Sequence, residues 1–158
     1  MAFVHLTTFI AAPTERVFDL SRHVNVHKHS MNRYHEKPIQ GITSGVMELN
    51  DEVKWEARHL FKTRILQVRI TSMKKPGYFK DEQVHGDFKT MKHEHYFKPA
   101  ENGTLMIDQF HYDVPYGLAG KLFDKFYLEK YIMRLLKERN AAIKQIAESN
   151  QWKQYLNS

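Results

Sequence analysis

The chain has 158 residues, of which 42% are hydrophobic and 27% are charged, and it contains no cysteine. This composition excludes a disordered chain, whose apolar content would be too small to offset the entropy lost on ordering. The length predicts one domain, residues 1–158, that is large enough to bury a core. The lack of cysteine excludes disulfides, thiolate nucleophiles and cysteine-bound metal centres.

The net charge is +6, from 24 basic and 18 acidic side chains. The two signs are interleaved along the chain without a nucleic-acid recognition motif, so we predict a mixed-charge surface and no nucleic-acid partner. No apolar run approaches the roughly 18–20 residues of a membrane span. Residues 1–7 do not resemble a signal peptide, and we therefore expect a soluble, cytoplasmic protein.

The N-terminal third predicts a strand followed by helical segments. Residues 3–10 are rich in β-branched and aromatic side chains, which is typical of a strand. Pro13 suits the first turn of a helix that we expect to continue through Leu20. The polar, histidine-rich residues 23–35 predict a short helix or loop, and the simplest interpretation of its histidines places them at the surface. These are His23, His27, His29 and His35.

The middle of the chain predicts a series of strands. Apolar and polar residues alternate with a period of two in five segments, which are residues 53–59, 66–70, 79–85, 91–97 and 104–114. Turn signals occur at residues 74–77 and again at residues 101–103. Connections this short favour antiparallel pairing of the strands that they join.

After residue 117 the period becomes helical. Apolar residues recur at spacings of three, four or their sums from Leu118 to Ala147, and no Pro or Gly interrupts residues 121–150. This pattern predicts one helix about 45–50 Å long, which exceeds the roughly 40 Å diameter of a compact domain of this size. We expect it to lie along the open face of the sheet, with Leu122 and Phe126 on its inner stripe.

Strand alternation also predicts which side chains point inward. Ten of these are candidates for the inner surface: Trp55, His59, Phe79, Asp81, Gln83, His93, His95, Phe97, Asp108 and Tyr112. An unsatisfied buried polar group costs about 1–3 kcal/mol, against a typical total stability of about 5–15 kcal/mol. The histidines and aspartates must therefore be paired, hydrated or both. A polar core held by pairs and a wet cavity that accepts a ligand both remain open.

Several segments resemble the START/SRPBCC superfamily, which includes birch-pollen-allergen-like proteins and polyketide cyclase/dehydrase relatives. The likeness covers almost the whole chain and is closest to bacterial ligand-binding SRPBCC domains. It rests on residues 10–20, 53–59, 79–89, 93–97, 103–108 and 112–117. The resemblance implies an α+β helix-grip fold, in which a curved antiparallel sheet wraps around a long C-terminal helix. It also implies a cavity between them for an apolar or amphipathic small molecule.

We therefore expect a non-catalytic carrier or sensor of a small lipid-like or polyketide-like ligand. Its apolar wall would include Trp55, Phe79, Phe97, Leu122 and Phe126, and the inward polar groups would orient the ligand. One alternative is a cyclase or dehydratase that uses a histidine beside Asp81 or Asp108 for acid–base chemistry. Another is a protein-interaction module with a vestigial cavity.

The pair His93 and His95 also raises the question of a metal. Residues two apart on a strand project the same way, about 6.5–7 Å apart, so two imidazoles could share an ion. In the strand-borne metal sites of cupins such a pair is followed by a Glu after a short gap and by a second block with another His. Here Glu101 comes too late, and no His follows residue 117. We expect no metal and no permanent cofactor. Neither the ligand's identity nor the oligomeric state follows from the sequence.

Overall fold

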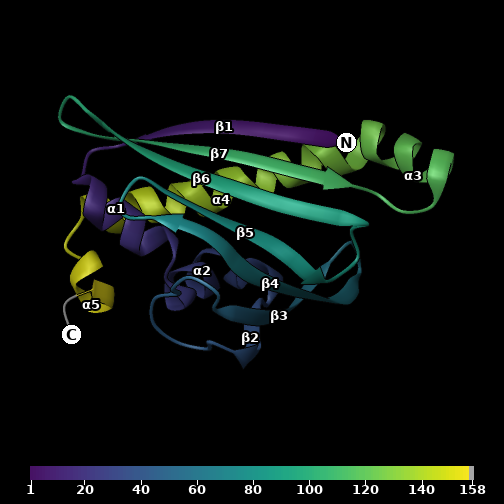
Figure 1. The fold of residues 1–158 in the computed structure, drawn as a ribbon, viewed down its shortest axis with the longest axis horizontal. Coiled ribbons are helices and arrows are strands. Elements are labelled where there is room, and N and C mark those ends of the chain that lie inside the picture. Colours follow the sequence, from purple (N-terminus) through teal and green to yellow (C-terminus); the bar gives the residue numbers. More distant parts are fainter. Residues whose placement is uncertain (157–158) are drawn as a thin grey trace.

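Seven antiparallel strands form one sheet in the computed structural model, which describes residues 1–156 (Figure 1). Their order across the sheet is β1-β7-β6-β5-β4-β3-β2, so the chain moves from strand to neighbouring strand except at β1, which pairs with β7. The strands are β1 (Ala2–Ile10), β2 (Lys37–Gly41), β3 (Glu52–His59), β4 (Lys62–Lys74), β5 (Tyr78–His85), β6 (Thr90–Ala100) and β7 (Gly103–Asp113). The predicted antiparallel α+β fold is confirmed.

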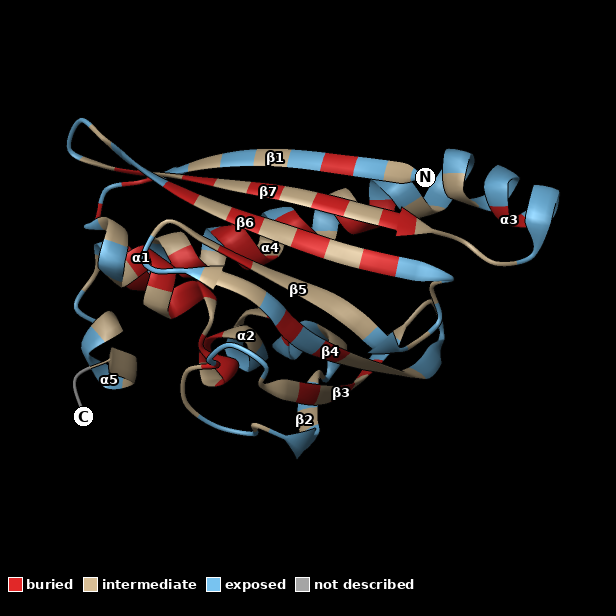
Figure 2. Ribbon diagram, in the orientation of Figure 1, coloured by how far each residue is buried: buried red, intermediate tan, exposed pale blue. Residues whose placement is uncertain are grey.

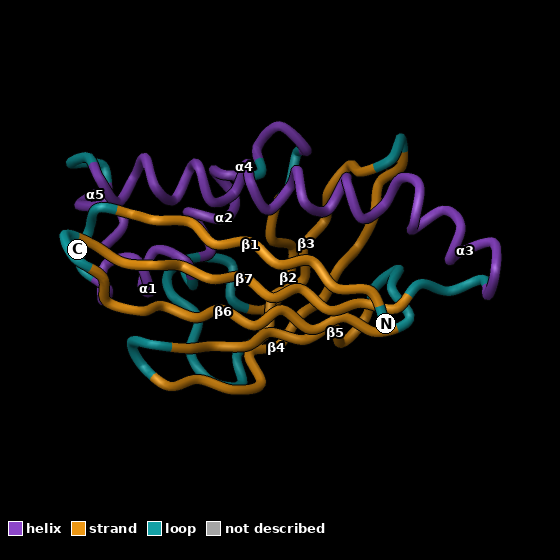
Figure 3. The backbone as a smooth tube through the Cα atoms, turned by 90° about the horizontal axis from the view of Figure 1, so that it is seen from above, coloured by secondary structure: helices purple, strands orange, loops and turns teal. Residues whose placement is uncertain are grey.

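Short helices link β1 to β2, and a long helix follows β7. The first group comprises α1 (Thr14–Ser21), α2 (Val24–Ser30) and the 3-10 turn η1 (Asn32–Tyr34). The long helix is continuous through α3 (Gly117–Phe123), the π-helical turn η2 (Asp124–Leu128) and α4 (Glu129–Glu148), and α5 (Trp152–Leu156) comes after it. Figure 3 shows the long helix running along one side of the sheet, with α3 extending beyond the strands. Within residues 1–156, no helix is both long and apolar enough to cross a membrane.

The predicted alternation is clearest on β6 and β7, where buried and half-buried residues follow one another (Figure 2). The buried set faces the helices and forms the core. The C-terminal half of α4 closes this core with Ile143, Ile146 and Ala147, while Phe18 from α1 packs against Phe79 and Phe97. The N-terminal half of α4 faces a hollow instead, which sets the position of the site.

The long helix does not keep a single phase along its length. A π-helical turn holds one residue more than an α-helical turn, which rotates the preceding residues by about 100° relative to the rest. The prediction that Leu122 and Phe126 lie on the inner stripe is therefore wrong. Their exposed fractions are 50% and 69%, and Phe123 and Tyr127 turn toward the hollow in their place.

Candidate functional site: a cavity with two polar clusters

A cavity of about 870 Å³ lies between the strands β3 to β7 and the helix α3–η2–α4. Its volume is within the range of small-molecule sites, about 300–1,000 Å³. Met91 and Phe110 from the sheet and Ile132 and Leu136 from α4 contribute to a largely apolar wall. The hollow that the sequence predicts between sheet and helix is present.

Half of the predicted site residues line this cavity, namely Trp55, His59, Phe79, Asp81, His93 and His95. Among the others, Gln83 uses its side-chain amide to bond the backbone of Phe88 at 2.9 and 3.3 Å, so it stabilises the turn after β5. The ring of Phe97 packs 5.3 Å from that of Phe18, within the solid core. The Tyr112 hydroxyl donates to the Asp124 carboxylate, away from the cavity. Asp108 is fully buried behind His93.

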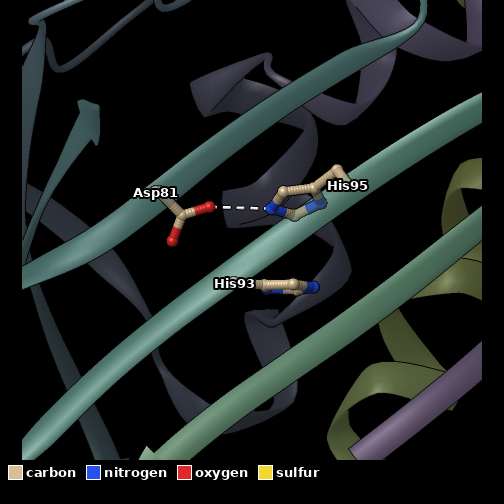
Figure 4. Close-up of side chains that lie close together, drawn as sticks. All are labelled: Asp81, His93 and His95. Atoms are coloured by element: carbon tan, nitrogen blue, oxygen red, sulfur yellow. Dashed lines mark hydrogen bonds and ion pairs between the residues drawn. The ribbon is translucent and has the colours of Figure 1, made fainter. Parts of the chain in front are cut away.

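A sheet-centre cluster forms where β5, β6 and β7 run side by side, and we define it as Asp81, His93, His95 and Asp108. Figure 4 shows His93 and His95 projecting from the same strand, with Asp81 on the neighbouring strand facing them. His95 Nε2 lies 2.7 Å from an oxygen of Asp81, and His93 Nε2 lies 2.8 Å from Asp108 Oδ1. Each histidine is therefore held by a carboxylate from an adjacent strand.

Asp108 links this cluster to α4. Its second oxygen accepts a 2.7 Å hydrogen bond from Asn140, and the Arg139 guanidinium lies 3.4 Å from its first oxygen. Burial opposes ionisation of Asp108, but the hydrogen bond from His93 and the nearby Arg139 charge outweigh burial and hold its pKa well below the usual range. Asp108 thus stays ionised and positions His93 without reaching the cavity itself.

His93 is neutral near pH 7. Burial, followed by the adjacent His95, lowers its pKa to about 4. Because an ionised carboxylate can only accept, His93 must donate its Nε2 hydrogen to Asp108, and its Nδ1 carries a lone pair. This residue can therefore act as a hydrogen-bond acceptor, or as a base, in the cavity wall.

His95 is enclosed between two rings and two carboxylates. Its imidazole stacks on Phe79 and on His93, with ring centroids 4.1 and 3.8 Å apart. Its Nδ1 lies 3.5 Å from Asp108 without forming a hydrogen bond, so Asp81 is its principal partner. Burial raises the pKa of Asp81, but the bond from His95 more than reverses this, and the carboxylate is ionised. Pairing and an open cavity, the two alternatives left by the sequence, occur together.

The geometry of this cluster favours hydrogen bonding over metal binding. Asp81, His93 and His95 each have a potential ligand atom within 4.8 Å of the others. However, a metal must lie close to the plane of each imidazole that binds it, because the nitrogen lone pair lies in that plane. The two rings are stacked with only 27° between their planes, so an ion in the plane of one ring lies off the plane of the other.

An edge cluster forms a second polar region of the cavity wall, and we define it as His27, Glu36, His59 and Tyr131. The Glu36 carboxylate lies 2.5 Å from His27 Nε2 and 3.6 Å from His59 Nε2, and His59 Nδ1 bonds the Tyr131 hydroxyl at 2.7 Å. Burial disfavours the charged form of Glu36, yet the two histidines lower its pKa to about 2. Glu36 is therefore a second ionised carboxylate in the wall.

Only His59 of this cluster is among the residues predicted from the sequence. The prediction that His27 lies at the surface is wrong, because its ring packs 4.5 Å from that of Trp55 and borders the cavity. The same prediction is wrong for His23, which is buried and also borders the cavity. The spacing of Val24, His27 and Met31 places all three on one face of α2, and this pattern could have identified His27. Glu36 lies between η1 and β2, outside any periodic pattern, and no comparable signal marks it.

Comparison with protein-family models gives no match, and comparison with curated proteins gives none either. Solved structures do match over nearly the whole chain. TTHA0849 from Thermus thermophilus is 18% identical with a TM-score of 0.73, covering 94% of this chain and 100% of that one. A START superfamily protein from Mycobacterium smegmatis is 11% identical with a TM-score of 0.69, covering 92% and 97%.

A major latex-like protein from Panax ginseng is 13% identical with a TM-score of 0.66, and the match covers 94% of this chain and 98% of that one. Identities this low establish the architecture and leave the function open. The arrangement of sheet, long helix and intervening cavity agrees with what the sequence motifs imply. The chain has the helix-grip fold that these solved structures share, the START superfamily protein among them.

Proposed function

We propose that the chain binds one small, largely apolar molecule in the cavity and acts as a carrier or sensor. The observation that carries this proposal is the hollow itself. Protein interiors are close-packed, with few voids larger than a water molecule, whereas this one leaves about 870 Å³ beside Trp55 and Phe79. The helix-grip fold of the solved structures described above supports the same function.

The polar clusters favour a ligand that donates hydrogen bonds. Asp81 and Glu36 are ionised and accept only, and His93 offers the lone pair of Nδ1. A neutral hydroxyl or amine hydrogen suits these groups. At these two clusters a fatty-acid carboxylate would instead face ionised carboxylates, which repel it. The arginines of the wall, Arg22, Arg64 and Arg139, already pair with acids. We therefore infer a neutral, hydroxylated apolar molecule as the ligand class.

Two measurements test this function. Mass spectrometry of organic extracts from the purified protein should find a recurrent neutral molecule. Titration with the apolar fluorophore N-phenyl-1-naphthylamine should show a single saturable site, and Ala57→Phe, which fills part of the cavity, should weaken its binding by at least about tenfold. The matched control Ala141→Phe changes an exposed position of α4 and should leave binding intact. Equal binding by both variants would refute the cavity as the site.

A second candidate function is acid–base catalysis of the cyclase or dehydratase type, and the pairing of His93 with Asp108 favours it. A neutral imidazole oriented by a buried carboxylate is the arrangement of a general base. His93 would remove a proton from the bound molecule, and the Asp108 charge would stabilise the imidazolium that forms. Consumption of the extracted molecule on incubation, lost in His93→Gln while binding persists, would establish catalysis. Recovery of the molecule unchanged would leave the carrier function.

A further inference from the structure

Exposed apolar side chains gather in two segments of the chain that line the cavity. They come from two places, the turn between β3 and β4 and the segment from Tyr116 to η2, and both places line the cavity. We call this set the apolar rim: Phe61, Tyr116, Leu118, Leu122, Phe123 and Phe126. The exposed fractions of Phe61 and Tyr116 are 94% and 86%. Exposed large apolar side chains in this number are unusual for a free surface and mark an interaction site.

The helical part of the rim projects away from the body of the molecule. Figures 1 and 3 show α3 extending past the end of the sheet, and Figure 2 shows it as largely exposed. Its only buried residue is Gly120, which approaches the backbone so closely that a Cβ there would lie 1.9 Å from the Pro115 carbonyl oxygen. The apolar side chains of α3 therefore contribute almost nothing to the core.

Phe61, in the turn between β3 and β4, also contributes nothing to the stability of the fold. Leu60 and Phe61 have φ values of 52° and 65° and connect the paired residues His59 and Lys62. A two-residue hairpin turn with two positive φ angles favours asparagine and glycine, and a bulky side chain in this region is strained. Phe61 thus adds strain at a turn where its ring packs on nothing that would compensate.

Positive charge accompanies the rim. Lys62, Lys121, Lys125 and Lys130 are exposed, and none lies within ion-pair distance of an acid among residues 1–156. The nearby acids are largely engaged: Asp87 pairs with Arg64 at 2.6 Å and Asp124 accepts from Tyr112. Glu129 is exposed and forms no ion pair among residues 1–156. The rim therefore combines exposed apolar side chains with lysines that form no ion pair among residues 1–156.

We propose that the apolar rim docks on an anionic lipid surface. Aromatic and aliphatic side chains interleaved with lysines are the composition of interfacial helices, in which the apolar face enters the lipid boundary and the lysines meet anionic headgroups. A second copy of the chain fits less well, because a two-fold contact through this face would oppose lysines to lysines. Docking would bring Phe61, Tyr116 and Phe123, which line the cavity, to the lipid, and this consequence rests on the proposed ligand-binding function.

Co-sedimentation with vesicles tests the docking. The full chain should bind vesicles of phosphatidylcholine and phosphatidylglycerol, bind pure phosphatidylcholine weakly, and detach as salt is raised. The double variant Leu122→Glu/Phe126→Glu should bind at least about tenfold more weakly. The control Val84→Glu changes a residue of similar exposure, 48%, on β5 and should bind like the unmodified chain.

A second variant separates docking from folding. Phe61→Asn introduces a residue that suits the left-handed turn, so the melting temperature should stay the same or rise while vesicle binding falls severalfold. Failure of the full chain to bind anionic vesicles, or equal binding by the double variant, overturns the proposal. A dimer that the double variant dissociates, without vesicle binding, assigns the rim to a second copy and also overturns it. N-phenyl-1-naphthylamine binding should be unchanged in the double variant, which keeps this test independent of the cavity.

Discussion

The two polar clusters of the cavity differ in how the chain assembles them. The sheet-centre cluster comes from three neighbouring strands, and α4 covers it with Arg139 and Asn140. The edge cluster draws on four parts of the chain, with His27 from α2, Glu36 before β2, His59 from β3 and Tyr131 from α4. The side chains of His27 and His59 remain 29% and 20% exposed, whereas that of Asp108 is fully buried.

This difference in burial indicates which cluster contributes more to the stability of the fold. A charge enclosed by protein has no alternative partner, so removing its counterpart leaves an uncompensated charge. A charge whose neighbours are partly exposed, as His27 and His59 are, can be rehydrated when its partner is lost. The sheet-centre cluster should therefore dominate stability, while the edge cluster should be more tolerant of substitution.

Asp108→Ala should have the largest effect. It leaves the Arg139 charge, the His93 Nε2 hydrogen and the Asn140 amide without their acceptor, so we expect a loss of about 3–5 kcal/mol in the free energy of unfolding. Urea denaturation measures this loss. If the variant fails to fold, Asp108→Asn, which keeps one acceptor oxygen, should still be clearly destabilised. A loss below about 1 kcal/mol for Asp108→Ala would contradict the role of this residue.

The second-largest effect should be a loss of stability on acidification, caused by His93. In the unfolded chain a histidine is protonated below a pH of about 6.5, whereas the native His93, with a pKa of about 4, stays neutral until the pH falls to about 4. The unfolded state therefore binds more protons between these values, and the free energy of unfolding should fall as the pH drops from about 6.5 to 4. The His93 share is on the order of 3 kcal/mol.

His93→Gln should flatten this slope, and the difference between the two pH profiles isolates His93 from His23, whose pKa is also lowered by burial. The lowered pKa values of Glu36 and Asp108 act in a lower window, because their stabilisation is present above pH about 4 and is lost as the pH falls further. Identical profiles for the variant and the unmodified chain between pH 6.5 and 4 would show that His93 is not buried as described.

Glu36→Gln should destabilise less than Asp108→Ala, by about 1–2 kcal/mol. It removes the negative charge and one of the two acceptor oxygens that face His27 and His59, but both imidazoles keep access to water from the cavity side. The same urea titration gives the value. A loss as large as that of Asp108→Ala would remove the distinction between the two clusters.

Tyr131→Phe should have the smallest effect of the series. Only the hydrogen bond to His59 is lost, so the free energy of unfolding should change by about 1 kcal/mol or less. Tyr127→Phe serves as the matched control one helical turn away and should change it even less. If Tyr131→Phe proves as damaging as Glu36→Gln, the edge cluster depends on its hydroxyl rather than on its carboxylate.

The sequence predicts the sheet-centre cluster because alternation in a strand fixes the direction of residues two apart, as for His93 and His95. It also predicts the long helix, since no Gly or Pro interrupts residues 121–150. The π-helical turn carries no Gly or Pro that would reveal it, so the helical period alone places Leu122 and Phe126 on the wrong face. Strand β2 is only five residues long and includes Pro38, too short for a periodic pattern. Glu36 enters the cavity wall only through tertiary folding, which local patterns do not describe.

The most direct test of the cavity as a ligand site is a crystal structure of the protein soaked with N-phenyl-1-naphthylamine. We predict the probe between the sheet and α4, in contact with Trp55 and Phe79 and with its N–H directed at the Asp81 carboxylate or His93 Nδ1. A cavity filled by the protein's own side chains, with the probe bound only at the outer surface, would contradict the proposed function.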